Sequence, residues 1–379
     1  MRQTLRLGTV MGIPVGVNWS VAAALVLVAD VLARSILPAS APGVSGGVRW
    51  AAAAVTAVLF LASLAAHEFA HAVVARRFGV KVVSITLWML GGVARFEGEP
   101  PTARADLRIA AVGPAMSGAL ALAFGGAWAL AGVAGAPATA VACLGWLAAT
   151  NVLLAVFNLL PAAPLDGGRI LRGFLWRSRG DRVSAAHTAD RAGTVLGFVM
   201  IGGGLLALLA GAWLDGLWLA LVGWFIVAAA KVEDRWTDLR EAAAGRRIAD
   251  VMTPHPAHGW TWQPAGAFAE TVVQASRQPV FPVVDAAGDP VGAVTTARLV
   301  RLRSEEAGTA LARYMTRLDP DRVVGPEEPA SAVLKATPMP GGLLAVVAAD
   351  HRLLGIVTTE DLQRLVQQAR LGGSRGTTA

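Results

Sequence analysis

Charged side chains and cysteine are scarce in this 379-residue sequence. Only 16% of the residues are Asp, Glu, Lys or Arg, and 55% are hydrophobic, whereas about a quarter of a soluble domain is charged. The single cysteine, Cys143, cannot form an internal disulfide. These absences exclude a single soluble domain, a disordered chain and a disulfide-rich secreted scaffold.

The few charges are also unevenly distributed. Residues 1–230 carry 16 basic and 9 acidic side chains, a net charge of +7, whereas residues 231–379 carry 17 of each sign. A basic excess within an apolar region indicates membrane topology and not a nucleic-acid partner. We expect a membrane-embedded domain over residues 1–230, a linker over 231–245 and a soluble region beyond it.

Six apolar stretches are long enough to cross a bilayer, which needs about 20 residues. They lie at 17–37, 51–75, 107–132, 137–160, 191–212 and 214–230. The connections 76–108 and 169–191 hold twelve Lys and Arg residues, against two in the 34–49 loop on the other side. Because basic loops stay in the cytoplasm, we expect a multi-pass plasma-membrane protein, surrounded by lipid, with both termini cytoplasmic.

Two further patterns interrupt or follow the apolar helices. Residues 80–96 are rich in β-branched side chains around Gly91-Gly92, which predicts a β-hairpin at the cytoplasmic edge of the membrane. The soluble region repeats itself: Val251-Met252-Thr253 returns as Tyr314-Met315-Thr316, and the segment 292–296 returns at 355–359, both offset by 63 residues. We expect two α/β repeats, 246–308 and 309–371, and a disordered tail over 372–379.

Three ionisable residues stand together in the second apolar stretch. In His67-Glu68-Phe69-Ala70-His71 the two histidines lie one helical turn apart, so both imidazoles can reach one cation. Glu68 beside them is placed to take a proton from a water on that cation. The alternative is a pair of core histidines bonded to the backbone or to Glu68. The apolar surroundings favour the metal site, because unliganded polar groups are costly there.

A catalytic zinc site needs a third protein ligand. Asp166 is the best candidate, because Pro161 and Pro164 break the fourth apolar helix just before it and Gly167-Gly168 permit a tight turn. The second and fourth stretches both run inward, which places His71 and Asp166 at a similar depth. An ordinary turn or helix-cap aspartate is the alternative.

The two motifs together resemble the site-2 protease family of intramembrane zinc metalloproteases. The resemblance covers about residues 1–230 and includes Gly113-Pro114 in the third apolar stretch. It implies that His67, His71 and Asp166 hold Zn²⁺, that Glu68 activates water, and that Asn158 engages the substrate or its oxyanion. The implied substrate is a single-span membrane protein, such as an anti-sigma factor. Ser117 departs from the asparagine of many relatives, which leaves a packing or substrate contact open.

The predicted hairpin could present the substrate to this site. A transmembrane helix must unwind before its peptide bonds can be attacked, and its freed backbone groups then need partners. We expect the substrate to pair as an added strand at an edge that includes Ile85, with Gly91 and Gly92 close by. A hairpin that only lies at the interface is the alternative.

The duplicated region resembles a CBS-domain pair, or Bateman module. The nucleotide pattern of that family matches residues 355–361, which implies that Thr358 faces the phosphates and Asp361 the ribose of an adenosine nucleotide such as ATP or AMP. In the first repeat, Arg298 stands where the aspartate would be. A purely structural module, or one that forms homodimers, is the alternative.

The predicted fold is therefore a polytopic α-helical membrane domain with a membrane-edge hairpin, followed by an α/β CBS tandem. A CBS-gated transporter or channel and an inactive membrane scaffold are the rival functions. A transporter predicts polar groups along a path across the membrane, whereas the ionisable residues here cluster at one depth.

Overall fold

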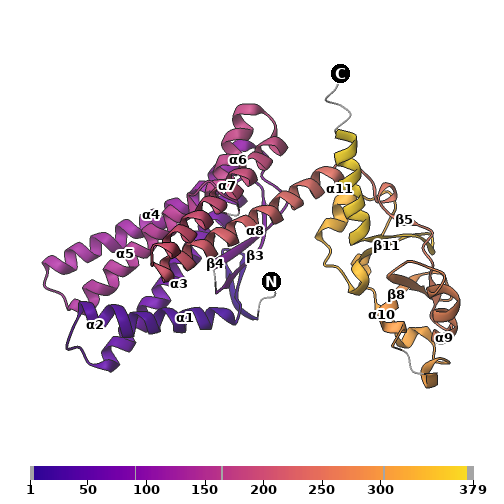
Figure 1. The fold of residues 1–379 in the computed structure, drawn as a ribbon, viewed down its shortest axis with the longest axis horizontal. Helices are drawn as coiled ribbons and strands as arrows, with labels where there is room; N and C mark the ends of the chain where they lie inside the picture. Colours follow the sequence, from indigo (N-terminus) through magenta and orange to yellow (C-terminus); the bar gives the residue numbers. More distant parts are fainter. Residues whose placement is uncertain (1–3, 90, 164, 302–303, 374–379) are drawn as a thin grey trace. The chain divides into compact units, whose positions relative to one another are not determined.

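The computed structural model describes residues 4–89, 91–163, 165–301 and 304–373. The chain forms two compact units, Met1–Asp234 and Arg235–Ala379, which Figure 1 colours from indigo to yellow along the sequence. The division falls four residues after the predicted end of the membrane domain. Most of the predicted tail lies outside the described residues.

Among the residues that the structure describes, six helices are long and apolar enough to cross a membrane, as predicted. Leu, Val and Ala cover their outer faces, so these helices expose apolar side chains to lipid. They are α1 (Ser20–Val31) with its continuation through η1 (Leu32–Ile36) and α2 (Leu37–Ser40), α3 (Gly46–Arg77), α4 (Ala103–Val133), α5 (Ala138–Asn158), α7 (Arg182–Leu209) and α8 (Trp213–Ala243).

Helix α8 continues beyond the apolar stretch that predicted it. It ends at Ala243, so most of the expected 231–245 linker is helical. The reason is local: residues 231–243 contain neither proline nor glycine and include several good helix formers. Gly245, with φ of 70°, follows the helix end, where a left-handed residue commonly stops a helix.

A four-stranded sheet accompanies the helices of the first unit, in the order β1-β2-β3-β4. The strands are β1 (Leu5–Val10), β2 (Ile13–Val17), β3 (Lys81–Trp88) and β4 (Gly91–Glu97). The predicted hairpin is confirmed as β3–β4, but the N-terminal hairpin β1–β2, which turns at Met11 and Gly12 with positive φ, was not predicted.

The unexpected hairpin changes the position of Ile85. Strand β2 pairs with β3 through Val15 and Ile85, while β4 pairs with the other side of β3 through Ala94 and Ile85. The prediction that Ile85 lies at a sheet edge is therefore wrong: it is central and 1% exposed. Strand β4 is the last strand of the sheet order on that side.

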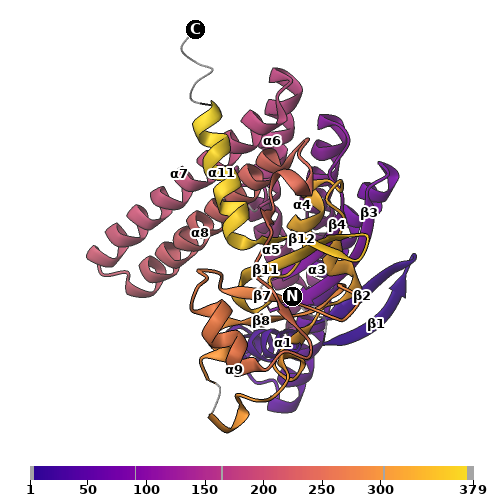
Figure 2. The same ribbon diagram turned by 90° about the vertical axis from the view of Figure 1, so that its right-hand side faces the viewer.

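The second unit confirms the internal duplication and adds an exchange of strands. One sheet has the order β6-β7-β8-β9 and the other β10-β11-β12-β5. Strand β5 from the first repeat completes the sheet of the second, and β9 from the second repeat completes the sheet of the first. Figure 2 shows β7 with β8 and β11 with β12. The bounds are β5 (Thr253–Pro254), β6 (Gly259–Trp260), β7 (Val280–Val284), β8 (Pro290–Thr295), β9 (Thr316–Arg317), β10 (Val323–Val324), β11 (Leu343–Ala349) and β12 (Arg352–Thr358).

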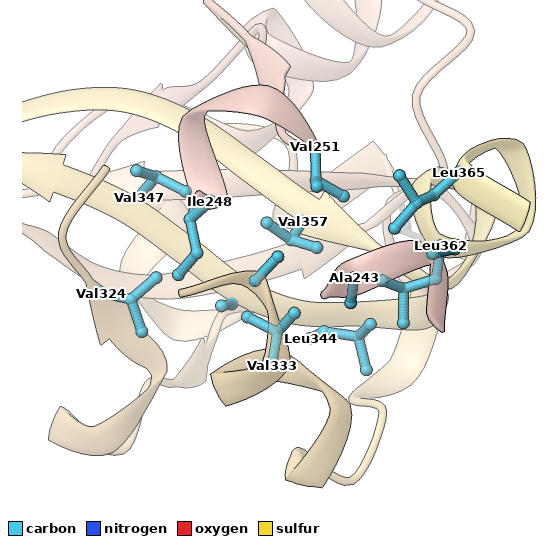
Figure 3. Close-up of a cluster of buried hydrophobic side chains, with 13 residues drawn as sticks. Ala243, Ile248, Val251, Val324, Val333, Leu344, Val347, Val357, Leu362 and Leu365 are labelled. Carbon is cyan, nitrogen blue, oxygen red and sulfur yellow. The ribbon is translucent and has the colours of Figure 1, made fainter. Parts of the chain in front are cut away.

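The repeated sequence motifs make the exchange contacts. A Cβ on Gly355 would lie 2.5 Å from Met252 Sδ, and one on Gly292 would lie 2.5 Å from Met315 Sδ. Each methionine thus packs on the glycine of the other repeat. The core of the second repeat also includes Ala243 at the end of α8, as Figure 3 shows. The shorter helices are α6 (Asp166–Arg179), α9 (Ala265–Phe268), α10 (Thr296–Leu299) and α11 (Thr359–Gly373).

Candidate metal centre and active site

Three predicted ligands converge in the first unit. His67 and His71 lie on α3, and Asp166 is the first residue of α6. The His67 and His71 Nε2 atoms are 3.2 Å apart, and Asp166 Oδ2 lies 3.2 Å from the first and 3.1 Å from the second. The three residues are 3%, 4% and 8% exposed. They form a compact, buried triangle of two nitrogens and one oxygen.

The dimensions of this triangle fit a tetrahedral zinc ion. Ligand atoms about 2.0–2.1 Å from such an ion are about 3.3 Å from one another, close to the distances between these atoms. Three ligands also leave the fourth position for water or substrate, as catalytic zinc sites do. The donor set is therefore that of a catalytic zinc site.

The histidine hydrogen bonds also point to a cation. His71 Nδ1 donates to the Ile109 carbonyl oxygen at 2.5 Å, and His67 Nδ1 lies 2.8 Å from Ser117 Oγ. A proton on each Nδ1 leaves a lone pair on each Nε2 of the neutral rings, so two lone pairs face the Asp166 carboxylate. A cation relieves that repulsion. The core-histidine alternative accounts for the Nδ1 contacts but not for the converging Nε2 atoms.

Glycine is required where α4 approaches the two histidines. A Cβ on Gly113 would lie 2.1 Å from His71 Nε2 and 2.7 Å from His67 Nε2. Such separations are far inside van der Waals contact. Gly113 therefore keeps open the space in which the two nitrogens meet.

The turn after α5 positions Asp166. Gly167 and Gly168 pack on the backbone of this turn, where their Cβ atoms would lie 2.2 Å from the Leu160 oxygen and 2.5 Å from the Ala163 nitrogen. Asp166 begins α6, where a carboxylate suits the helix dipole. Pro164, part of the sequence motif, lies outside the described residues.

A buried ion pair ties α6 to α4. Arg172 on α6 donates two hydrogen bonds, at 2.9 and 2.8 Å, to the carboxylate of Asp106 on α4, which is fully buried. Arg169 lies 3.8 Å from the same carboxylate. This bidentate pair fixes the helix that supplies the third ligand.

Glu68 lies between the ligands and the sheet. A Cβ on Gly92 would be 2.2 Å from Glu68 Cγ, and the Ala94 backbone amide hydrogen-bonds to the Glu68 carboxylate. Both contacts come from β4, so the strand at the end of the sheet lies against the predicted proton acceptor. Gly91, with φ of 148°, opens this strand.

The other two predicted substrate contacts, Asn158 and Ile85, have partners other than the metal ligands and Glu68. Asn158, the last residue of α5, is half-buried and donates from Nδ2 to the Leu154 carbonyl at 2.9 Å. Ile85 lines an apolar cavity of about 260 Å³ together with Phe69, Ala65 and Ala66 of α3 and Val10 and Val15 of the N-terminal hairpin. Sequence reasoning missed this hairpin and the role of Ile109, whose backbone carbonyl carries no residue-type signal.

The residues predicted to hold nucleotide have structural partners. Asp361 accepts from the Thr358 amide and hydroxyl at 2.8 and 2.7 Å, and the Asp361 amide donates to Thr358 Oγ1 at 3.3 Å. This is a capping box at the start of α11. Asp361 also accepts from Thr253 Oγ1 at 2.7 Å, which ties the exchanged strand β5 to the second repeat. In the first repeat the equivalent residue is Arg298, whose side chain cannot accept hydrogen bonds as the Asp361 carboxylate does.

A buried His–His–Asp centre with an adjacent glutamate, with both histidines and the glutamate on a helix that can cross a membrane, defines a zinc metalloprotease of the membrane-embedded class. The sequence pattern of peptidase family M50 matches residues 55–135 and 125–202. Rip3 of Mycobacterium tuberculosis strain H37Rv, whose name assigns it to the zinc metalloproteases, is 43% identical over 376 residues, 98% of this chain and 95% of its own. The chain belongs to the peptidase M50, or site-2 protease, family.

Solved structures are also similar to parts of the chain. The site-2 protease from Methanocaldococcus jannaschii is 29% identical, with a TM-score of 0.41, over 61% of this chain and 94% of its own. The CBS domain of a bacterial CNNM/CorC family Mg²⁺ transporter, in complex with ATP, is 17% identical with a TM-score of 0.29, over 36% of this chain and 97% of its own.

Proposed function

We propose that this zinc metalloprotease is an intramembrane endopeptidase that cleaves the transmembrane segment of a single-span, membrane-tethered regulatory protein, of which an anti-sigma factor is an example. One observation carries the proposal: His67, Glu68 and His71 all belong to α3, a helix of 32 residues that is apolar enough to cross a bilayer. The reaction site therefore lies where a transmembrane substrate can reach it from the lipid.

The residues around the site have separate tasks in peptide hydrolysis. His67, His71 and Asp166 would hold the zinc ion, which when bound would supply a Lewis acid for the scissile carbonyl and a water that is nucleophilic near neutral pH. Glu68 accepts the proton of the attacking water and passes it to the departing amine. Asn158 stays a prediction as a donor to the developing oxyanion.

Strand β4 supports the proposal that the substrate is bound as an added strand. It ends the sheet on one side, and Gly92 and Ala94 lie against Glu68. An unwound substrate pairing there satisfies its backbone in an apolar setting and runs past the proton acceptor. An apolar side chain of the substrate suits the nearby cavity, which the side chains of Phe69 and Ile85 line.

The arginine distribution supports the proposed orientation. With twelve basic residues in the two connections that flank the site, both termini and the duplicated unit lie in the cytoplasm of a plasma-membrane protein. The duplicated unit is then a cytoplasmic regulator that takes an adenosine nucleotide near Thr358 and associates into homodimers. Nucleotide binding there requires the Thr358–Asp361 capping box to rearrange or to share its hydroxyl.

The variant Glu68→Gln tests the proposed function. We expect it to bind zinc as the wild type does but to cleave about 10²–10⁴-fold more slowly, because the proton acceptor is lost. The full chain is purified in detergent, its zinc content is measured, and the single-span protein that co-purifies with the variant is identified and used as substrate. Glu327→Gln, a change of an exposed glutamate that pairs with Arg247 in the duplicated unit, is the matched control.

Unchanged cleavage by Glu68→Gln overturns the proposal. Transport of an ion that persists in Glu68→Gln would instead favour the CBS-gated transporter, and a wild type that holds zinc and partner without cleaving would favour the scaffold.

A further inference from the structure

A second group of potential metal ligands lies outside the active site, at the junction of α7 and α8. His187 and Asp190 are three residues apart on α7 and therefore share a face, and Asp234 belongs to α8. Their ligand atoms all lie within 4.8 Å of one another. His187 Nδ1 is 2.7 Å from Asp234 Oδ1.

The packing of the two helices places these carboxylates opposite each other. A Cβ on Gly204 would lie 2.6 Å from the Ala220 nitrogen, and one on Gly197 would lie 2.5 Å from Val227 Cγ2. The two contacts are seven residues apart on each helix. Asp190 lies seven residues before Gly197 on α7, and Asp234 lies seven residues after Val227 on α8, so the same spacing continues to the two aspartates. The close contact between α7 and α8 thus runs directly into the pair of aspartates.

The buried carboxylate of Asp190 is the reason that this group of ligands calls for a cation. It is 4% exposed, and its Oδ2 atom has no hydrogen-bond partner among the residues that the structure describes. A buried carboxylate oxygen without a partner is costly. The nearby Arg172 makes its bidentate hydrogen bonds to Asp106, and Glu233 adds further negative charge beside Asp190.

We propose that His187, Asp190 and Asp234 form a second divalent-cation site, separate from the catalytic centre, that joins α7 to α8. One imidazole and two carboxylates suit a first-row transition cation such as Zn²⁺ or Mn²⁺. The His187 and Asp234 side chains are 27% and 43% exposed, so water completes the coordination and the ion enters from that side. The unpartnered Asp190 oxygen becomes a ligand.

Metal stoichiometry of the full-length protein tests this proposal. The protein is stripped with a chelator, equilibrated with Zn²⁺, washed free of excess ion and analysed for bound metal. We expect two equivalents in the wild type and one in the double variant His67→Ala/His71→Ala. Addition of His187→Ala to that double variant removes the remaining equivalent, and addition of Asp190→Asn does the same.

His351→Ala in the same background is the matched control, because His351 also pairs with an aspartate, Asp289, at 2.8 Å but on an exposed surface. It should keep one equivalent. His187→Ala changes a partly exposed residue, so it keeps the test decisive if Asp190→Asn does not fold. No zinc in the double variant, or zinc retained after loss of His187, overturns the proposal. A wild-type protein that binds two equivalents of zinc but does not cleave would contradict the proposed function and leave the second metal site supported.

Discussion

Single glycines set the geometry of the catalytic site. Gly113 keeps the two Nε2 atoms of the histidines accessible, while Gly92 lets β4 lie against Glu68. The first glycine borders the metal ligands and the second borders the proton acceptor. Substitution at each position should therefore affect a different property of the enzyme.

Gly113→Ala should lose the zinc of the catalytic site. Its methyl group would occupy the space in front of His71 Nε2, and we expect zinc affinity to fall by at least about 10- to 100-fold, the range for changes around metal ligands. Zinc titration of the purified protein measures this. Gly118→Ala, on the same helix with no neighbour within 4 Å of the new methyl group, should bind zinc normally. Equal affinities in both variants would contradict the assigned role of Gly113.

Gly92→Ala should keep zinc and lose cleavage. The new methyl group displaces the Glu68 side chain, and a displacement of about 1 Å can cost about 100-fold in rate. Parallel measurements of zinc content and turnover separate the two effects. A variant that cleaves normally would show that Glu68 and β4 need not be in contact during the reaction.

At the residue scale, the sequence predicts features that depend on neighbouring residues, but not contacts between residues that are distant in the sequence. The spacing of His67 and His71 predicts one helical face, and the prolines and glycines around Asp166 predict a turn. Ser117 could be recognised only as a departure from the family, although the structure places it on His67 Nδ1. A helix crossing decides that contact, and sequence periodicity does not determine which helices cross.

At the scale of secondary-structure elements, the catalytic ligands depend on how α3, α4 and α6 are held together. Helix α6 contributes one ligand and is tied to α4 by the buried Arg172–Asp106 pair. Its position is thus maintained by an interaction six residues away from Asp166. Loss of the Arg172–Asp106 ion pair should therefore shift α6, displace Asp166 and weaken metal binding.

Arg172→Met should destabilise the membrane unit and weaken zinc binding. The substitution keeps a long side chain but leaves the fully buried Asp106 carboxylate without its main partner, which costs about 3–5 kcal/mol. Arg169, 3.8 Å away, can compensate in part, so the lower end is expected. Thermal unfolding with and without zinc measures the loss. The double variant Arg172→Met/Asp106→Leu should recover much of it, and failure of that rescue would count against the ion pair.

The sheet shows what sequence alone does not determine about elements. Alternating β-branched residues and Gly91-Gly92 predicted the hairpin β3–β4, because its pairing is local. The parallel pairing of β2 with β3 joins segments about 70 residues apart in the sequence, and nothing in residues 81–88 specifies that neighbour. For this reason Ile85 was assigned to an edge that β2 occupies.

At the scale of the whole molecule, the chain combines a membrane unit with a unit made of two interlocked repeats. The repeat was evident from sequence identity at an offset of 63 residues. The strand exchange was not, because β5 and β9 are only two residues long. Each exchanged strand follows a methionine that packs on a glycine of the other repeat.

Met315→Ala should loosen both sheets together. Loss of the contact with Gly292 weakens β9 on β8, and because the repeats share strands, the disturbance reaches β12 as well. We expect a loss of about 2 kcal/mol, the low end for a partly exposed methionine. Hydrogen exchange of the amides in β8 and β12 measures it. Val300→Ala, at an exposed position, should change neither, and faster exchange confined to β8 would show that the repeats open independently.

The strand exchange also restricts how this part of the gene can change by recombination. Deletion of one repeat would remove a sheet and would also leave the surviving sheet without its fourth strand. A viable breakpoint must therefore fall before Ala242 and Ala243, which belong to the core of the second repeat, or after residue 371, so the two repeats are gained, lost or transplanted as a pair. The two repeats therefore behave as a single unit in recombination, although the sequence of one duplicates that of the other.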